Sequence, residues 1–275
     1  MPDQVTTIIT TDKAVANNEM RLSICLRTNG FSFSTVAAEQ ELLTFGEAAF
    51  DLHRPVGELT DAIRGFFDAQ GIATFECRQV RLIVPSERCV WVPEHLYDAR
   101  RDRQYLQTVT ALAGDAGVCH AYSGSVGAYV VFTAPSEVVT AFKVALPGVD
   151  VVCQHSVLAN EMLMQQSAQH PVVLMHVRDG VGDFESFYNS QLLMSNSYAA
   201  TDEEGLLYHA LNVMKTLHLE TPDMELTICG EVGRGIYGML QHYFPNVTLY
   251  TGRPFTFSNP EFQTFHTYRH ALLLS

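Results

Sequence analysis

The sequence predicts an α/β protein made of two similar halves, with a small α+β module inserted between them. Two observations predict this class. A hairpin, a helix and a strand follow one another near the N-terminus, and the same order recurs after residue 170. At 275 residues, the chain also reaches the size, roughly 250–300 residues, at which one hydrophobic core stops growing. We therefore predict three parts, at residues 20–100, 101–154 (the insertion) and 155–275.

Composition and charge exclude several classes of function. Hydrophobic residues make up 47% of the chain and charged residues 17%, which is enough apolar material for a packed core. The net charge of −13, with only 17 Lys and Arg and no run of them, argues against binding nucleic acid or an anionic membrane. No apolar stretch reaches the roughly 20 residues of a membrane-spanning helix, so we expect no direct membrane insertion.

The cysteines and the N-terminus favour a cytoplasmic protein. The first residues lack the basic and apolar regions of a signal peptide. The six cysteines are scattered and form no CxxC pair, so neither a zinc ribbon nor a thioredoxin motif is available. We expect buried, reduced thiols.

The first half begins with a hairpin, after a polar lead-in over residues 1–19. Residues 21–26 alternate with period two, as a half-buried strand does, and the pair Asn29 and Gly30 is typical of a tight hairpin turn. The helix that follows has an apolar stripe at helical spacing, and Gly71 stands where a terminating glycine belongs. The predicted elements are strands at 21–26, 31–36 and 41–45, a helix at 57–70 and a strand at 79–84.

The insertion is predicted to contain both helices and strands. Pro135 stands in the favoured first position of its second helix. The predicted elements are a helix at 102–113, a hairpin of strands 118–123 and 128–133, a helix after residue 135 and a strand at 149–153. A helix at 156–166 then leads to the second half.

The second half repeats the order of the first. Thr201 and Glu204 have the spacing of a capping box at the start of a helix that Pro222 ends. Asn259 and Pro260 are typical of the start of one last helix. The predicted elements are an apolar strand at 171–177, a turn at 178–183, a second strand through 187, the capped helix, a strand at 225–229, a helix at 236–244, a strand at 247–250 and the last helix.

Four short motifs lie in this second half: residues 176–180 (HVRDG), 193–198 (LMSNSY), 207–209 (LYH) and 228–231 (ICGE). Together they resemble a Bacteroidetes family that carries only a domain-of-unknown-function label. The order of elements resembles the actin-like ATPase superfamily, in particular its pilus-assembly and cell-division branch, which has a subdomain at about this insertion point. The resemblance covers residues 20–275 and implies two duplicated ribonuclease H-like halves.

The sequence departs from the superfamily at both phosphate loops. The superfamily's first loop contains an Asp that holds Mg²⁺ through water, whereas residues 26–30 contain no carboxylate. In the second loop, the matching strand-end position is His176 or Arg178. A hard cation needs oxygen ligands, which neither side chain supplies, although an Arg can bind phosphate directly. We therefore expect that hydrolysis is lost and that the chain has no catalytic residues and no metal site.

A degenerate nucleotide site is expected in three turns, and ATP is the only cofactor that the resemblance implies. Gly-rich turns can bind phosphate through backbone N–H groups. The alternatives are an ordinary hairpin turn at 179–183 and, after residue 229, glycines that let a helix pack closely on the sheet. The candidate residues are Asn29, Gly30, Asp179, Gly180, Gly182, Gly230, Gly233 and Arg234.

Other candidate sites are weaker. His266 and His270 have i, i+4 spacing and could bind a metal, but a solvated helix face is the alternative, since no third ligand is nearby. Trp91, between two valines, is expected in the core. No GxSxG motif of a nucleophile elbow occurs.

These observations leave three hypotheses. The first, which we favour, is a non-catalytic scaffold that binds a protein partner or a second copy through the inserted module. The second is a regulatory protein that binds ATP weakly. The third is a kinase or phosphatase, which requires a carboxylate pair that only Asp179 and Asp183 could supply. Candidate contact residues of the module, each with core burial as the alternative, are Tyr105, Tyr122, Tyr129 and Phe132.

Overall fold

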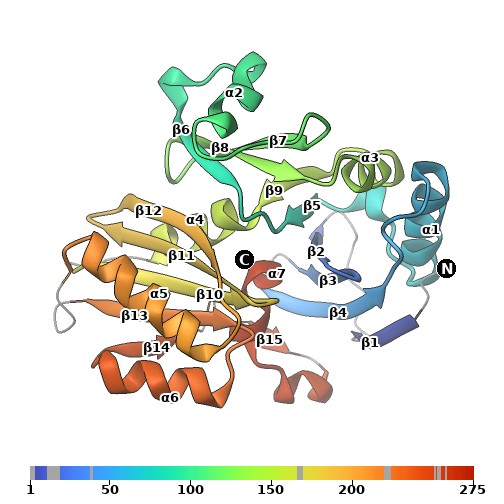
Figure 1. Cartoon of the computed structure of the whole chain (residues 1–275). Coiled ribbons are helices and arrows are strands. Elements are labelled where there is room, and N and C mark those ends of the chain that lie inside the picture. The colour runs from blue at the N-terminus through green and yellow to red at the C-terminus, as the bar shows by residue number, and fades with distance from the viewer. Residues whose placement is uncertain are drawn as a thin grey trace.

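Two large sheets lie side by side, and a small third sheet stands above them (Figure 1). The structure, a computed structural model, describes residues 4–10, 19–37, 40–165, 170–219, 224–250, 252, 255–257 and 259–275. Within this part of the chain, no helix is both long enough and apolar enough to cross a membrane.

The first large sheet has the strand order β1-β4-β3-β2-β5-β9, with β15 added beside β4. Helices α1 and α3 pack on its outer face, where Phe31 of β3 contacts Phe66 and Phe67 of α1 and Phe142 of α3. The elements are β1 (Gln4–Thr10), β2 (Arg21–Arg27), β3 (Gly30–Val36), β4 (Glu41–Ala49), α1 (Val56–Ala69), β5 (Gln79–Val84), α3 (Ser136–Ala145), β9 (Asp150–Cys153) and β15 (Thr256–Phe257).

The second large sheet has the order β12-β11-β10-β13-β14. Its outer face packs against α5 and α6 through side chains such as Met175, Val213 and Leu240. The elements are β10 (Val172–Arg178), β11 (Val181–Tyr188), β12 (Gln191–Ala199), α5 (Glu203–Thr216), β13 (Glu225–Gly230), α6 (Arg234–Tyr243) and β14 (Val247–Leu249).

The two large sheets repeat one topology. In each, three antiparallel strands are followed by a fourth strand that pairs parallel with the first and a fifth that pairs parallel with the fourth, so β4-β3-β2-β5-β9 matches β12-β11-β10-β13-β14. Helix α1 follows the third strand of the first half as α5 follows the third strand of the second. The predicted duplication of the halves is therefore confirmed.

The small sheet belongs to the inserted module and has the order β6-β8-β7. Its elements are β6 (Cys89–Pro93), α2 (Asp102–Gln107), β7 (Gly117–Ser123) and β8 (Ala128–Ala134). In the repeated topology, α3 and β9 belong to the first half and β6 to the module. Sheet membership does not define independent folding units, so the division at 101–154 stays a prediction.

The inner faces of the two large sheets share one hydrophobic cluster. It contains Ile83 and Phe45 from the first half, and Leu174 and Phe187 from the second. Helices α4 (Gln154–Gln165) and α7 (Ala271–Leu274) lie between the sheets and complete this cluster. All four residues of α7 are buried, and Ser34 Oγ of β3 donates a hydrogen bond to the carbonyl oxygen of Leu273 (2.9 Å).

Several predicted elements are wrong at their ends or in kind. The polar lead-in contains a strand that was not predicted, because residues 4–10 form β1 along the edge of β4. The sequence did not predict β12, whose Ser195 and Ser197 hydroxyls bind buried carboxylates of β11. The helix predicted over 102–113 ends at Gln107, where the Thr108 hydroxyl donates to the carbonyl of Tyr105.

The predicted helix caps and the last helix also need correction. Asp202, not Thr201, caps α5 by accepting a hydrogen bond from the Gly205 N–H, and α5 ends at Thr216. Pro222 lies outside the described residues. The last helix is broken into two 3₁₀ turns, Pro260–Thr264 and Thr267–His270, before α7, because His266 has an extended backbone. Asn259 does cap its start, by accepting from the Glu261 N–H.

We expect Leu273→Ala to lower the free energy of unfolding by about 2–5 kcal/mol, because it opens a cavity in the shared cluster. Leu273 is only 2% exposed. The matched control is Leu193→Ala on β12, where the side chain is 45% exposed and the expected change is within about 0.5 kcal/mol. Denaturant unfolding measures both values. Equal effects of the two substitutions would contradict a structural role for α7.

Candidate functional site

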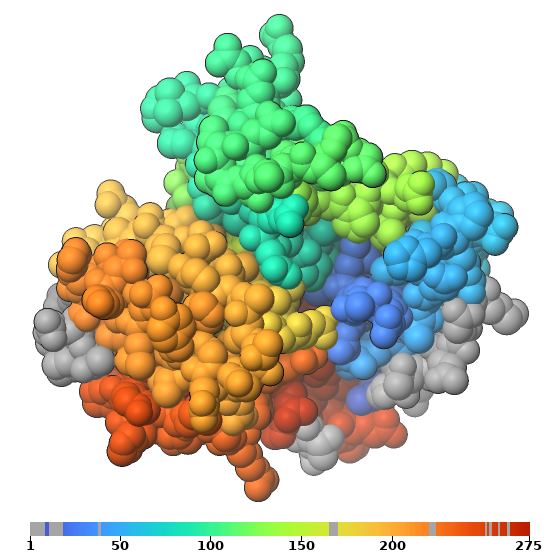
Figure 2. All heavy atoms as spheres, in the orientation of Figure 1, coloured from blue at the N-terminus to red at the C-terminus, as the bar shows by residue number. Residues whose placement is uncertain are grey.

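A cavity of about 230 Å³ lies between the two halves, and of the candidate residues predicted from the sequence, Asp179 and Gly230 are in its lining. Its lining includes Arg27 of β2, Arg178 and Asp179 at the β10–β11 turn, and Gly230 and Glu231 after β13. Leu272 and Leu273 of α7 also line it. In Figure 2, side chains of the second half reach those of the first half beneath the module.

The conformation of the β2–β3 turn is set by its packing against the neighbouring strand of the sheet. Gly30 has a φ of +138°, and a Cβ there would lie 2.1 Å from the carbonyl oxygen of Ala48, so only glycine fits. The carbonyl of Asn29 accepts a hydrogen bond from the N–H of Phe50. Both residues therefore serve the packing of β3 on β4.

The β10–β11 turn has positive φ at both central residues, Asp179 (38°) and Gly180 (74°). This is the conformation of a tight two-residue hairpin turn, in agreement with the ordinary-turn interpretation. Gly182 follows on β11, where a Cβ would contact Phe184 and Leu206. Its role is close packing of α5 on the sheet.

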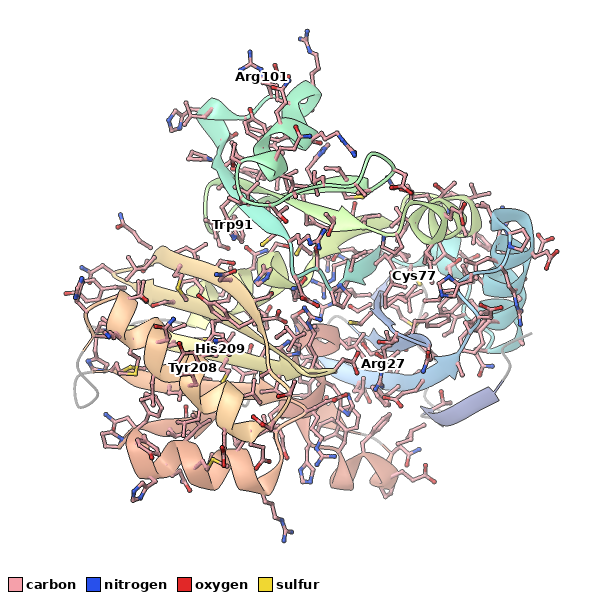
Figure 3. All side chains as sticks on the ribbon, viewed as in Figure 1. Arg27, Cys77, Trp91, Arg101, Tyr208 and His209 are labelled. Atoms are coloured by element: carbon pink, nitrogen blue, oxygen red, sulfur yellow. The ribbon has the colours of Figure 1, made fainter. Side chains whose placement is uncertain are left out.

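The two turns contact each other directly. Thr28 Oγ1 donates a hydrogen bond to Asp179 Oδ2 (3.3 Å) across the boundary between the halves. Arg27, labelled in Figure 3, forms ion pairs with Glu47 of β4 and with Glu231 beyond β13 (3.4 Å). A cationic side chain at the first turn is therefore already neutralised by two carboxylates.

Asp183 of β11 is fully buried and has a complete set of partners. Arg178 donates two hydrogen bonds to its carboxylate (2.8 and 3.0 Å), and Ser197 Oγ donates a third (2.6 Å). His176 Nδ1 lies 3.1 Å from Oδ2, and the Gln154 amide approaches to 3.4 Å. Burial opposes ionisation, but the His176 hydrogen bond and the charges of His155 and Arg178 hold the pKa of Asp183 well below its usual range.

This arrangement decides the partners of Arg178 and Asp183, two side chains for which sequence analysis considered functional roles. Arg178, the candidate for direct phosphate binding, is paired within its own hairpin, as expected for a bidentate Arg–carboxylate contact. Asp183 faces Arg178 rather than Asp179, so the two acids do not form a carboxylate pair. In the described part of the chain, no group of three His, Cys, Asp or Glu side chains could hold a metal ion.

A second buried carboxylate, Glu185, extends the network, and sequence analysis missed it. The Nδ1 of His155, at the start of α4, pairs with Glu185, and Ser195 Oγ donates to the same carboxylate (3.2 Å). His155 Nε2 lies 3.0 Å from Ser197 Oγ, which joins this pair to Asp183. Burial raises the pKa of Glu185 to about 7. The signal available in the sequence was the alternation of acids at 183 and 185 in an apolar strand.

The third turn, after β13, is occupied by an acidic side chain. Gly230 has a φ of +85°, and a Cβ there would lie 2.2 Å from the carbonyl oxygen of Val177. The carboxylate of Glu203, from α5, lies 3.0 and 2.0 Å from the positions of a Cβ on Gly233 and Gly235. Helix α6 begins at Arg234, which is exposed, so this carboxylate stands beside a helix N-terminus. Helix N-termini favour anions, and here the chain supplies its own.

The C-terminal histidines match neither of the two interpretations made for them. His270 lies against Phe45 and Phe265, with ring centroids 4.4 Å away in each case, and burial lowers its pKa to about 4. His266 stacks on Tyr268 instead. Because the helix is broken at His266, the i, i+4 spacing does not place the two imidazoles on one helix face.

The module presents an aromatic surface beside a second, larger cavity. Tyr122 is 47% exposed and hydrogen-bonds Glu94, and Tyr129 stacks on Tyr97. The Tyr105 hydroxyl donates to the carbonyl of Leu96, whereas Phe132 is fully buried and cannot be a contact residue. Trp91 is half-buried and touches two core clusters at the base of the module (Figure 3).

A cavity of about 510 Å³ lies between the module and the first half. His120 and Tyr122 of β7 line it on the module side, and Asp150, Ser156 and Asn160 line it on the other side. It is therefore larger than the cavity between the halves, and its walls are polar.

We expect Asp183→Asn to lower the free energy of unfolding at pH 7 by about 3–5 kcal/mol, because it leaves the half-buried Arg178 without an opposite charge. The pKa of Asp183 is depressed by folding, so its contribution is present above the unfolded value near 4 and is lost as pH falls. The difference between variant and wild type should therefore shrink on acidification. Asp179→Asn, in the neighbouring exposed turn, is the control; a similar loss there would contradict the assignment.

Comparison with known proteins places the chain in a family and a fold class. No curated protein sequence matches it. A Bacteroides thetaiotaomicron protein with an actin-like ATPase fold and unknown function has a TM-score of 0.74 at 18% identity, over 94% of this chain and 97% of that one. The PilM–PilN type IV pilus biogenesis complex gives a TM-score of 0.55 at 10% identity, over 92% and 96%.

At these identities, the solved structures show the fold alone, and they confirm the predicted actin-like architecture. The family evidence comes from the sequence. A model described as "Protein of unknown function (DUF3822)" matches residues 10–247, which is most of the chain. The chain therefore belongs to the DUF3822 family and has the actin-like ATPase fold.

Proposed function

We propose that this protein is a non-catalytic member of the actin-like fold that acts as a protein-interaction or assembly scaffold in the cytoplasm. In this proposal the site between the halves binds neither ATP nor a metal ion, and a partner or a second copy binds at the inserted module. The observation that carries the proposal is Glu203, whose carboxylate occupies the glycine turn at the start of α6.

Three features of the site between the halves support the loss of nucleotide binding. Glu203 and Glu231 put negative charge where a phosphate would need positive charge. Arg27 and Arg178, the nearby cations, are paired with carboxylates of this chain. The cavity of about 230 Å³ is also below the roughly 300–1,000 Å³ of sites that enclose a drug-sized ligand.

Two features support binding of a protein at the module. The cavity of about 510 Å³ between the module and the first half falls in the size range of binding sites and has a polar lining. Tyr122, on its rim, is an exposed aromatic side chain, a residue type enriched at protein interfaces. PilM, whose fold this chain shares, forms a type IV pilus biogenesis complex with PilN, which makes an assembly role a reasonable analogy.

Isothermal titration of the purified protein with millimolar ATP, with and without Mg²⁺, tests the first half of the proposal. We expect no saturable heat and no thermal stabilisation, because the chain's own carboxylates stand in the phosphate positions. Glu203→Gln, which removes one charge and keeps the size, is the comparison variant. Saturable binding by the wild-type protein that Asp179→Ala or Gly230→Trp removes would instead favour the regulatory ATP-binding hypothesis.

Photo-cross-linking tests the second half of the proposal. A benzophenone side chain at Tyr122 should give adducts with a partner or a second copy, and Asn160→Trp, which fills the adjacent cavity, should remove them. The matched control is the same probe at Tyr208 of α5, which is 64% exposed and lies on the other half (Figure 3). Equal adducts at both positions, or adducts that survive Asn160→Trp, would contradict docking at the module.

A further inference from the structure

The first turn of α4 is a joint between the two halves. Helix α4 follows β9 of the first half directly and precedes β10 of the second half. The Gln154 side chain accepts a hydrogen bond from the N–H of Ser86, in the segment after β5 (2.8 Å), and donates one to the Ser86 carbonyl (2.7 Å). The next residue, His155, is hydrogen-bonded to Glu185 of β11. Two successive side chains therefore connect this turn to the first half and to the second sheet.

The hydrogen bonds beyond His155 run in one direction, toward Asp183. The pKa of Asp183 lies well below its usual range, so its carboxylate is ionised and can only accept. The Ser197 hydroxyl donates its single proton to this carboxylate (2.6 Å). Ser197 must therefore accept from His155 Nε2, 3.0 Å away, and we assign a proton to this ring nitrogen.

The other ring nitrogen of His155, Nδ1, faces Oε1 of Glu185 within hydrogen-bonding distance. Two lone pairs at this distance would repel each other, so one proton must lie between the two atoms. On Nδ1, the proton makes an ion pair of a charged imidazole and a carboxylate, and the charge of His155 that acts on Asp183 belongs to this form. On Oε1, it makes an uncharged pair of an imidazole and a carboxylic acid.

Burial favours the uncharged pair. The side chains of His155 and Glu185 are both completely inaccessible to solvent. Within the part of the chain that the structure describes, Oε2 of Glu185 has no hydrogen-bond partner. A buried carboxylate oxygen without a donor is costly, whereas the carbonyl oxygen of an uncharged acid costs less. Burial accordingly raises the pKa of Glu185 to about 7.

The groups around the pair supply little net charge. Arg178 and Asp183 are paired with each other (2.8 Å), so their opposite charges largely offset. The charges that raise the pKa of His155 are those of an ionised Cys89 and an ionised Glu185, and a proton on Glu185 removes the second. Ser195, which donates to Glu185 Oε1 (3.2 Å), is neutral. The titratable and charged side chains on the neighbouring strands are His176 and Arg178 of β10, Asp183 of β11 and Cys89 of β6.

We propose that a proton on Glu185 is a latch that holds α4 against the second sheet. In the closed form, Glu185 donates this proton to His155 Nδ1, and the first turn of α4 joins the two halves. When Glu185 gives the proton to solvent, a buried carboxylate faces the lone pair of the imidazole, and the contact between α4 and β11 loosens. The connection between the halves therefore depends on pH.

Linkage gives the direction of this dependence. The pKa of Glu185 is about 7 in the closed form, whereas a solvated glutamate has a value of about 4.3. A pKa raised by folding contributes stability that is present at low pH and is lost as pH rises through the folded value. The latch is therefore closed in weak acid and loosens above neutral pH.

Opening of the latch would act on the module as well. Helix α4 also contacts the module, because Ser123 Oγ of β7 donates a hydrogen bond to Asn160 Oδ1 (2.7 Å). The module, the first half and α4 would then stay connected to one another while α4 loses its contact with β11. The inference does not depend on whether a partner binds at the module.

Denaturant unfolding of the wild type and of Glu185→Gln, at about pH 6 and about pH 8.5, tests the titration. Glutamine cannot ionise, and its amide keeps a donor for His155 Nδ1. Relative to the variant, the folding equilibrium constant of the wild type should fall roughly tenfold between the two pH values, given pKa values of about 7 and about 4.3. The matched control is Glu204→Gln, on an exposed side chain of α5, which should follow the wild type.

Amide hydrogen exchange shows where the protein loosens. After correction for the intrinsic exchange rates, the opening of α4 in the wild-type protein should increase roughly tenfold between the same two pH values. Helix α3 of the first half, which does not contact Glu185, is the control and should keep its protection. In Glu185→Gln, α4 should be equally protected at both pH values. The measurement on the wild-type protein tests the latch even where the variant fails to fold.

Three results would overturn the inference. The first is an equal change in the stability of the wild type and of Glu185→Gln with pH, because Glu185 would then not titrate in this range. The second is a wild type that gains stability relative to the variant as pH rises, which is the sign of an ion pair with a depressed carboxyl pKa. The third is a loss of protection that is equal in α4 and α3, because the pH effect would then not be local to the joint.

Discussion

The buried carboxylate of Asp183 fixes the positions of the polar side chains on the inner face of the second sheet. It sits on the inner face of the sheet and is bound by Arg178, Ser197 and His176, so one side chain ties β10, β11 and β12 together. Removing two charges from water is costly, and the cost is offset only when every lone pair has a donor. Once Arg178 is committed to this carboxylate, it is not free to meet a ligand at the neighbouring turn.

The same principle explains the rest of the region between the halves. Three polar groups of this region have partners within the chain: Arg27 is paired with Glu231, Thr28 donates to Asp179, and the carboxylate of Glu203 lies beside the start of α6. Beneath these contacts, α4 and α7 fill the space between the sheets with apolar side chains. Apolar contacts of this kind oppose separation of the two halves. The polar cavity between the module and the first half, in contrast, is not filled by side chains.

The sequence predicted the parts of the fold that depend on local signals. Gly30 marked the first hairpin because its positive φ and its close approach to Ala48 require glycine, and the periodic apolar positions of α1 marked its buried face. The strand β12 could not be predicted, because Ser195 and Ser197 look like loop residues until the buried acids of β11 are placed beside them. Glu203 was missed for the same reason, since its contact with Gly235 is made only when α5 packs beside α6.

The shared cluster between the sheets has a consequence for how the protein is made. Phe45 is synthesised early, Leu174 later and Leu273 near the end, yet all three belong to the same core. Contacts between residues so distant in sequence form slowly, because the conformational entropy of the intervening chain is lost before the contact contributes any stability. The first half therefore emerges from the ribosome with an incomplete inner face, which stays exposed to aggregation until the second half and α7 have also been translated. The common core of the two halves can therefore form only after residues of both sheets and of α7 have been translated.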